Sequence, residues 1–323
     1  MGGTHARLAL FREGDRDPAA VEIYPSAERG ALVEILAVFR DSHPDPIVAA
    51  TIGIAGPVDD GRTEAVNLAW PVDARELASG LELDPAAVAL INDLEANAWG
   101  IAALGDDDLV ALNGASGDPG GTVALISAGT GLGEAFITAG PDGQKVHPSE
   151  GGHVDFAPRN ELESELRAWL AREHRHVSYE RVCSGTGMPV VYAFVRGRSG
   201  EPEPEWLGRE IAEHGASAIT RAGLERRDRA CSDALDLLVS AYGAQAGNLA
   251  LTVLARGGVY LGGGIAPNIV DRLREGGFMQ AFLDKGRVSE IVEDIPVRVI
   301  GNELTALLGA GRHAASASKA ASG

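Results

Sequence analysis

A strand, a glycine turn and a returning strand occupy residues 122–138, and this unit constrains the fold more than any other feature. Thr122–Ser127 is typical of a buried strand, Gly129–Gly133 of a tight turn, and Glu134–Thr138 of the returning strand. Near the N-terminus, Gly2-Gly3-Thr4 precedes a predicted strand over Arg7–Phe11, as in the second half of the same unit. We therefore expect a fold of two related halves, with the first strand of the N-terminal hairpin absent.

Composition and charge narrow the class of protein. A chain of 323 residues, 45% hydrophobic and 23% charged, is long enough for one large or two medium globular domains. Its net charge of −18 repels phosphate backbones and anionic lipid, so we expect no nucleic-acid partner and no membrane-surface role. The two cysteines, Cys183 and Cys231, have no metal-ligand spacing, and two free thiols favour a cytoplasmic location.

Strand and helix patterns alternate along the chain and predict an α/β protein. Further strands are predicted over Ile47–Ile54, Ala87–Ile91, Gly258–Leu261 and Val297–Ile300. Helices are predicted over residues 27–40, 94–104 and 237–254, with a short one around residues 304–308. The Ala/Ser-rich tail from Ala314 is predicted to be disordered.

The turn Gly129-Thr130-Gly131-Leu132-Gly133 is a candidate phosphate site, because glycines allow positive φ and let backbone N–H groups approach phosphate oxygens. A P-loop is excluded because no Gly-Lys-Ser/Thr sequence occurs. A dinucleotide fold would need a helix after the glycines, where the pattern favours a strand. Taken alone, the turn is better interpreted as a plain hairpin turn.

Asn92-Asp93 follows a predicted strand, at the end where ligands collect in open α/β sheets. A carboxylate there can take a proton from a hydroxyl, and the neighbouring amide can hold that hydroxyl. The competing interpretation is that Asp93 caps the following helix, and from this pair alone capping is favoured.

Three other segments are weaker candidates. Glu150-Gly151-Gly152-His153 could turn a carboxylate and an imidazole toward one sugar, or could be an ordinary loop. Glu180 beside Arg181 is by itself typical of a surface pair. Gly262-Gly263-Gly264 could press bare backbone against a nucleotide, or could simply join a strand to a helix.

Taken together, these motifs resemble the bacterial glucokinase family of the actin-like ATPase superfamily, which includes hexokinases. The resemblance runs over nearly the whole chain and is carried by residues 2–10, Asn67–Trp70, Ile91–Asp93, Ala128–Gly133, Glu150–Pro158, His176–Gly185 and Gly262–Pro267. The run Glu150–Pro158 is the most specific of these.

The resemblance implies a two-domain actin-like ATPase (ribonuclease H-like) fold, with mixed sheets flanked by helices and an interdomain cleft. We expect residues 1–103 and 294–315 to form a small α/β domain, residues 104–293 a large one, and residues 316–323 a disordered tail. The family also suggests a homodimer.

The implied activity is ATP-dependent phosphorylation of D-glucose at the 6-hydroxyl, which gives glucose 6-phosphate and ADP and admits glucose to glycolysis. Asp93 would be the general base, and glucose would be held by Asn92, Asp93, Glu150, His153 and Glu180. ATP with Mg²⁺ would lie along Gly2, Gly3, Thr4, Gly129, Thr130, Gly131, Gly262, Gly263 and Gly264. Alternatives are a kinase for another hexose or an amino sugar, and a non-catalytic sugar-binding protein if the first strand is truly missing.

The sequence departs from the family pattern at its N-terminus. In the family, the first glycine hairpin follows a strand that ends in Asp-x-Gly-Gly-Thr, and that Asp is expected to help organise magnesium and the phosphates. Here Met1 stands where the residue after that Asp should be. We favour a start set too late, because the rest of the site is intact. If the chain truly begins at Met1, we expect poor folding and very low activity.

Overall fold

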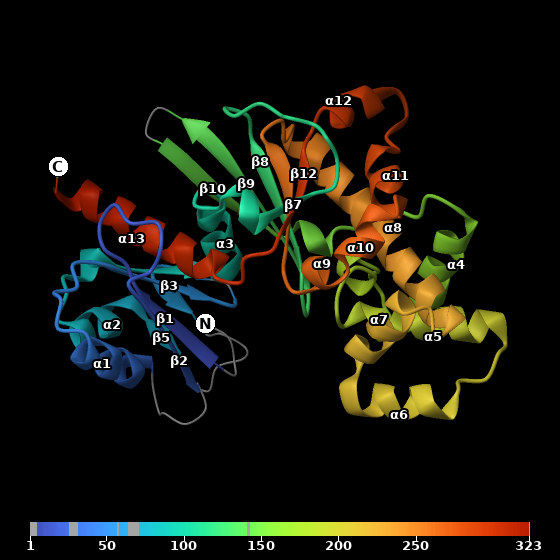
Figure 1. The fold of residues 1–323 in the computed structure, drawn as a ribbon, viewed down its shortest axis with the longest axis horizontal. Coiled ribbons are helices and arrows are strands. Elements are labelled where there is room, and N and C mark those ends of the chain that lie inside the picture. Colours follow the sequence, from blue (N-terminus) through green and yellow to red (C-terminus); the bar gives the residue numbers. More distant parts are fainter. Residues whose placement is uncertain (1–4, 26–31, 57, 64–70, 141–142, 323) are drawn as a thin grey trace. The chain divides into compact units, whose positions relative to one another are not determined.

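The computed structural model describes residues 5–25, 32–56, 58–63, 71–140 and 143–322, which form two compact units (Figure 1). Unit 1 comprises Met1–Asp108 and Asn302–Gly323, and unit 2 comprises Leu109–Gly301. Gly2, Gly3, Thr4 and Asn67–Trp70, which the sequence singled out, lie outside the described residues.

Unit 1 consists of short strands and helices from the N-terminal third of the chain and one helix from its C-terminal end (Figure 1). Its elements are β1 (His5–Leu10), β2 (Ala20–Pro25), α1 (Leu32–Ser42), β3 (Ala50–Ile54), β4 (Arg62–Thr63), β5 (Val72–Asp73), α2 (Ala74–Leu81), η2 (Pro85–Ala87), β6 (Val88–Asn92), α3 (Asp93–Ile101), η3 (Asp106–Asp108) and α13 (Thr305–Ser322).

The strands of unit 1 pair two by two among the described residues. β1 runs antiparallel to β2, β3 runs parallel to β6, and β4 runs antiparallel to β5. Helix α1 buries Leu32, Ile35, Leu36 and Phe39, the apolar positions that predicted it. The carboxyl end of β6, in the parallel pair with β3, carries Asn92, one of the predicted site residues.

Helix α13 corrects the prediction for the C-terminal end of the chain. The sequence predicted a short helix around residues 304–308 and disorder from Ala314, whereas one helix runs over Thr305–Ser322. It packs along α3, and His313 lies edge-on against Trp99. Alanine is the strongest helix former, so an Ala-rich segment with a packing partner is helical rather than disordered.

Unit 2 carries the largest sheet, flanked by most of the helices (Figure 1). Its elements are β7 (Leu109–Ala111), β8 (Val123–Ala128), β9 (Leu132–Gly140), β10 (Gly143–Ser149), η4 (Gly151–His153), α4 (Glu161–Leu170), η5 (Tyr179–Arg181), α5 (Gly187–Ser199), α6 (Glu205–His214), α7 (Ala216–Leu224), α8 (Arg229–Val253), β11 (Gly258–Gly262), α9 (Ile265–Asn268), α10 (Val270–Arg274), α11 (Gly277–Leu283), η6 (Gly286–Val288), α12 (Ser289–Glu293) and β12 (Val297–Ile300).

The sheet has the order β10-β9-β8-β11-β12-β7. The hairpin strands β8 and β9 are antiparallel, with Ala128 opposite Leu132, as the opening strand, turn, strand pattern predicted. β11 lies between β8 and β12 and is parallel to both. Helix α8, 25 residues long, packs against α5, α7 and α11 and brings a largely apolar surface to the core.

The boundaries of the units differ from the predicted ones. Residues 294–301 were assigned to the small domain, but β12 is hydrogen-bonded to β11 on one side and to β7 on the other, which fixes it in the sheet of unit 2. Residues 104–108 were assigned to the large domain and belong to unit 1. There Asn302 Nδ2 donates to Asp108 Oδ1 at 2.9 Å, and Arg16 pairs with the same carboxylate.

Candidate active site

The end of β6 and the start of α3 place Asn92 and Asp93 side by side in unit 1. Asn92 is the N-cap of α3: its Oδ1 accepts from Leu94 N at 2.8 Å, and its Nδ2 donates to Gly56 O at 2.9 Å. Asp93 stands in the first helical turn, and its Oδ1 also accepts from Leu94 N, at 2.9 Å. The cap that the sequence favoured for Asp93 therefore falls to Asn92, and the Asp93 carboxylate is not needed for it.

Asp93 has the electrostatics that a general base needs. Burial raises the pKa of its carboxyl above the ordinary value, and the bond from Leu94 N–H opposes part of that rise. A carboxylate with a raised pKa is a stronger base than one in water. Asp93 is thus chemically able to take a proton from a hydroxyl.

In unit 2 the structure brings together three of the predicted sugar-binding residues. Glu150 immediately precedes η4, His153 is its last residue, and Glu180 lies in η5. His153 Nε2 is 3.9 Å from Glu150 Oε2, and His153 Nδ1 is 3.8 Å from Glu180 Oε1. The Glu150 side chain is 91% exposed, His153 57% and Glu180 28%, so the group faces solvent and is open to a polar ligand.

Glu180 also joins this group to the glycine hairpin. Its Oε2 accepts from Leu132 N at 3.0 Å. A Cβ on Gly131 would lie 2.5 Å from the same oxygen, so a larger residue there would require the Glu180 carboxylate to shift. The glycines Gly129, Gly131 and Gly133 are not in the left-handed region, contrary to one reason given for them from the sequence. Gly131 instead allows the Glu180 carboxylate to lie close to the backbone of the turn.

The segment that follows η5 is hydrogen-bonded to the turn of the β8–β9 hairpin. Gly185 N donates to Gly129 O at 2.8 Å, and Thr186 donates to Thr130 O from both N and Oγ1. The second predicted nucleotide segment also lies beside the hairpin: Gly263 has φ +78°, and a Cβ there would be 2.2 Å from Ala128 O. The predicted phosphate-binding turns of unit 2 are therefore neighbours.

Sequence reasoning missed a set of buried polar residues beneath these segments. Glu134 Oε1 accepts from Gln245 Nε2 at 2.7 Å, and Asn248 Nδ2 donates to Tyr179 Oη at 3.2 Å. The available signal was a carboxylate in an apolar strand together with Gln245 and Asn248 in an otherwise apolar helix. Sequence alone gives no register between that strand and that helix.

Glu134 makes folding stability depend on pH. Burial raises the pKa of its carboxyl from 4.5 to about 7, and the Gln245 hydrogen bond offsets part of this rise. A raised folded-state pKa means that the folded state prefers the protonated form, so its contribution is full below pH 4.5 and is lost as pH rises through 7. Glu134→Gln lacks this titration, so wild type should lose about 3 kcal/mol of unfolding free energy relative to the variant between pH 4 and pH 8. Urea titrations at both pH values check this, and an equal difference at the two would contradict it.

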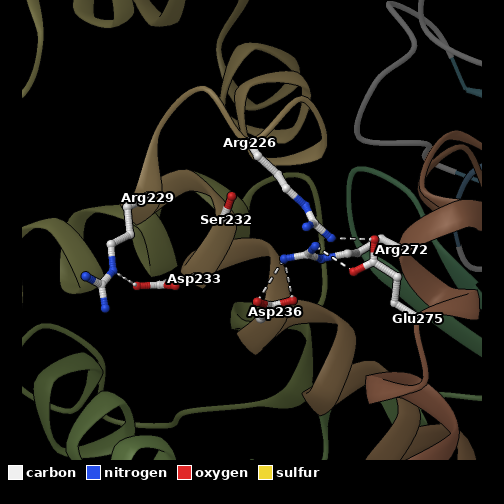
Figure 2. A pocket seen from close by; sticks show the side chains of 7 residues that line it. All are labelled: Arg226, Arg229, Ser232, Asp233, Asp236, Arg272 and Glu275. Atoms are coloured by element: carbon white, nitrogen blue, oxygen red, sulfur yellow. Dashed lines mark hydrogen bonds and ion pairs between the residues drawn. The ribbon is translucent and has the colours of Figure 1, made fainter.

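A cavity of about 520 Å³ lies elsewhere in unit 2 (Figure 2). It is lined by Arg226, Arg229, Ser232, Asp233, Asp236, Arg272 and Glu275. Its charged side chains pair with one another, Arg272 with both Asp236 and Glu275. A smaller cavity of about 60 Å³ is lined in part by Glu180 and Thr186. It lies beside the predicted site residues, whereas the larger cavity contains none of them.

Metal clusters and membrane spans are both absent from the described residues. These residues contain no group of three or more His, Cys, Asp or Glu side chains placed to hold a metal ion. None of their helices has the length and apolarity required to cross a bilayer.

Comparison with known proteins agrees with the resemblance. A sequence model of the family described as Glucokinase matches residues 1–317. The glucokinase of Synechocystis sp. is 38% identical, over 96% of this chain and 95% of its own. The crystal structure of a glucokinase from an Antarctic psychrotroph is 28% identical with a TM-score of 0.85, covering 97% of this chain and 96% of that chain.

A more distant structure supports the fold alone. It is a ROK family glucokinase from Streptomyces griseus in complex with glucose and AMPPNP, 20% identical with a TM-score of 0.64, covering 96% of both chains. The actin-like ATPase fold predicted from the sequence is confirmed, as is the resemblance. This chain belongs to the glucokinase family.

Proposed function

We propose that this chain transfers the terminal phosphoryl group of ATP to the 6-hydroxyl of D-glucose, with glucose 6-phosphate and ADP as products. Membership of the glucokinase family over nearly the whole chain supports the reaction. The structural observation that carries it is the Glu180 carboxylate, which contacts both the hairpin at Leu132 N and the sugar-binding group at His153. Phosphoryl transfer depends on holding the sugar and the phosphate close together, and this contact joins the segments proposed to bind them.

Asp93 acts as the general base in this proposal. It takes the proton from the 6-hydroxyl as that oxygen attacks the terminal phosphorus, and Asn92 contributes to sugar binding. Phosphoryl transfer has a loose transition state, so catalysis is mainly positioning and charge stabilisation. The half-buried Asp93 carboxylate, with its raised pKa, suits this limited role.

Glu150, His153 and Glu180 bind the sugar hydroxyls. Carboxylates accept hydrogen bonds from hydroxyl groups, and the imidazole can donate or accept. An epimer of glucose would leave one of these groups without its partner, which costs more than the loss of an apolar contact. This argument favours glucose over other hexoses and amino sugars.

ATP binds along the backbone of Gly129, Thr130 and Gly131 and against Gly262, Gly263 and Gly264. Backbone N–H groups at bare glycines can reach phosphate oxygens closely. Gly2, Gly3 and Thr4 complete the set in our proposal. Magnesium enters with ATP as part of the substrate, because Mg²⁺ is usually held by substrate phosphates and one or two carboxylates.

The cellular location and the oligomeric state of the enzyme are proposed from its cysteines and from its family. Cys183 and Cys231 are both free and buried, which suits a reducing compartment, so we propose that the enzyme works in the cytoplasm. We also propose a homodimer, as the family suggests. Sedimentation analysis of the purified protein distinguishes a dimer from a monomer.

A coupled assay for ADP release with a panel of sugars tests the proposed reaction. We expect glucose with Mg–ATP to give the highest kcat/KM, with mannose, galactose and glucosamine at least about fivefold lower, since each lost hydrogen bond is worth about 1 kcal/mol or more. Preference for another sugar would reassign the substrate. No ADP above background with any sugar would favour a non-catalytic sugar-binding protein, and replacing ATP by polyphosphate or ADP tests the donor.

A further inference from the structure

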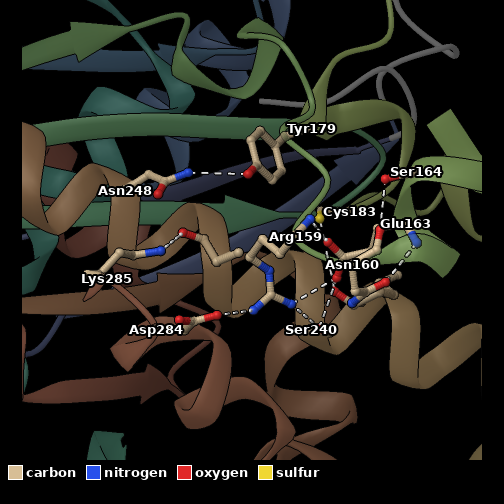
Figure 3. A network of polar contacts seen from close by, with 12 residues as sticks. Arg159, Asn160, Glu163, Ser164, Tyr179, Cys183, Ser240, Asn248, Asp284 and Lys285 are labelled. Carbon is tan, nitrogen blue, oxygen red and sulfur yellow. Dashed lines mark hydrogen bonds and ion pairs between the residues drawn. The ribbon is translucent and has the colours of Figure 1, made fainter. Parts of the chain in front are cut away.

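A buried chain of hydrogen bonds lies beneath the sugar-binding segments of unit 2. Gln245 Nε2 donates to Glu134 Oε1 at 2.7 Å and to Gly151 O at 3.3 Å. Asn248 Nδ2 donates to Gln245 Oε1 at 3.2 Å and to Tyr179 Oη at 3.2 Å, the latter visible in Figure 3. The chain thus connects β9, η4, α8 and η5 through side chains that sequence reasoning did not single out.

Both ends of this chain reach the sugar-binding residues. Gly151 lies between Glu150 and His153, and its carbonyl accepts from Gln245. Tyr179 immediately precedes Glu180 and is held by Asn248. Helix α8, which supplies the two amide side chains, is packed into the core of unit 2. One helix, α8, therefore sets the spacing of the two sugar-binding segments.

Gly151 and the Glu134 carboxylate are packed side by side. A Cβ on Gly151 would lie 1.9 Å from Glu134 Oε2, so a larger residue there would displace that carboxylate. Glu134 is 2% exposed, Gln245 3% and Tyr179 1%. Buried polar groups cost stability unless each is satisfied, and a satisfied network holds its members in one arrangement.

A purely structural role would be served as well by apolar side chains, because matched apolar pairs replace buried polar ones at little cost. Tyr242 shows the structural alternative on the same helix. It is fully buried and donates from its hydroxyl to Ile126 O at 3.1 Å, so it ties α8 to β8 and reaches neither sugar-binding segment. Tyr242 is therefore a matched control.

We propose that Glu134, Gln245 and Asn248 are positioning residues for the sugar, which hold the segments carrying Glu150, His153 and Glu180 at the spacing that glucose requires. This inference rests on the proposed function, because glucose is the ligand whose binding the network tunes. The three residues touch neither substrate in this proposal. They act through the backbone of Gly151 and through Tyr179.

Gln245→Leu tests the proposal by removing the donor to Gly151 O. We expect KM for glucose to rise about 10- to 100-fold, the effect of one lost buried hydrogen bond, with KM for ATP and kcat within about threefold of wild type. Since this variant leaves Glu134 buried without its partner, the double variant Glu134→Leu/Gln245→Leu is measured beside it. The double variant removes both polar groups, should fold more stably than the single one, and should keep the raised KM.

Tyr242→Phe completes the experiment. It should lower the thermal unfolding temperature while KM for glucose stays within about twofold, since it removes one buried hydrogen bond remote from the sugar. If the folded double variant kept a wild-type KM for glucose, or if KM and kcat moved together in all three variants, the positioning role would be overturned. Wild-type protein inactive on glucose would instead refute the proposed function and this inference with it.

Discussion

Replacing Asp93 with asparagine is expected to lower kcat by about 100- to 10,000-fold, the usual contribution of a general base. The dissociation constant of glucose should stay within severalfold of wild type, because asparagine has the same size and its Oδ1 can still accept from Leu94 N. The amide cannot take up a proton, so only the chemical step suffers. Turnover is measured by ADP release and glucose binding by calorimetry.

Glu95→Gln is the matched control for Asp93→Asn. Glu95 lies two residues further along α3, and burial raises the pKa of its carboxyl as it does for Asp93. We expect Glu95→Gln to keep kcat within about threefold of wild type, since general-base assistance depends on one positioned group. Unchanged turnover in Asp93→Asn, or an equal loss in Glu95→Gln, would remove Asp93 from the proposed role.

The same pair of variants makes a pH profile informative. The carboxylate form of Asp93 is the active one in the proposed mechanism, so kcat/KM should fall as pH drops through its raised pKa. The Glu95→Gln profile should retain that acidic limb. The residual activity of Asp93→Asn should lack it.

Replacing Gly152 with alanine is expected to have the second large effect. A Cβ at this position would lie 1.8 Å from Leu132 O and 2.8 Å from the Leu132 carbonyl carbon, both backbone atoms of the hairpin. Either η4 or the hairpin must move, which should lower the free energy of unfolding by about 1–3 kcal/mol. Because Glu150 and His153, the proposed sugar-binding residues, flank Gly151 and Gly152, kcat/KM for glucose should fall about 100-fold, the usual effect of a small misplacement.

Gly197→Ala is the control for the alanine substitution itself. Gly197 is an exposed residue of α5, and a Cβ added to it would meet nothing within 4 Å outside its own helix. Alanine there should raise the free energy of unfolding by up to about 1 kcal/mol and leave activity unchanged. Urea titration and steady-state kinetics check both variants. Wild-type kcat/KM in Gly152→Ala would mean that the contact with Leu132 O does not set the site.

Sequence predicted those parts of the fold in which local pattern and burial agree. Strands β8, β11 and β12 are continuous apolar runs between turns, and each lies within two residues of its predicted range. Helix α8 starts at Arg229, eight residues before the predicted Leu237, because its first two turns are less uniformly apolar and Asp228 caps them. Periodicity predicts the buried core of such elements better than their ends.

The rest depended on tertiary contacts that no local pattern encodes. The Ala-rich tail is helical because it packs on α3, and β12 belongs to unit 2 because β11 and β7 pair with it. In the candidate site, sequence and family resemblance picked out Glu150, His153 and Glu180, which the structure brings together. The Glu134–Gln245 bond joins residues 111 positions apart, beyond the reach of spacing arguments.

The most direct measurement of the central claim is the chemical identity of the product. Purified protein is incubated with glucose and Mg–ATP, and the products are analysed by ³¹P NMR with correlation to sugar protons. The account predicts ADP and one sugar phosphate whose phosphorus correlates with the two protons on carbon 6. A correlation with the anomeric proton, or ADP without any sugar phosphate, would contradict it.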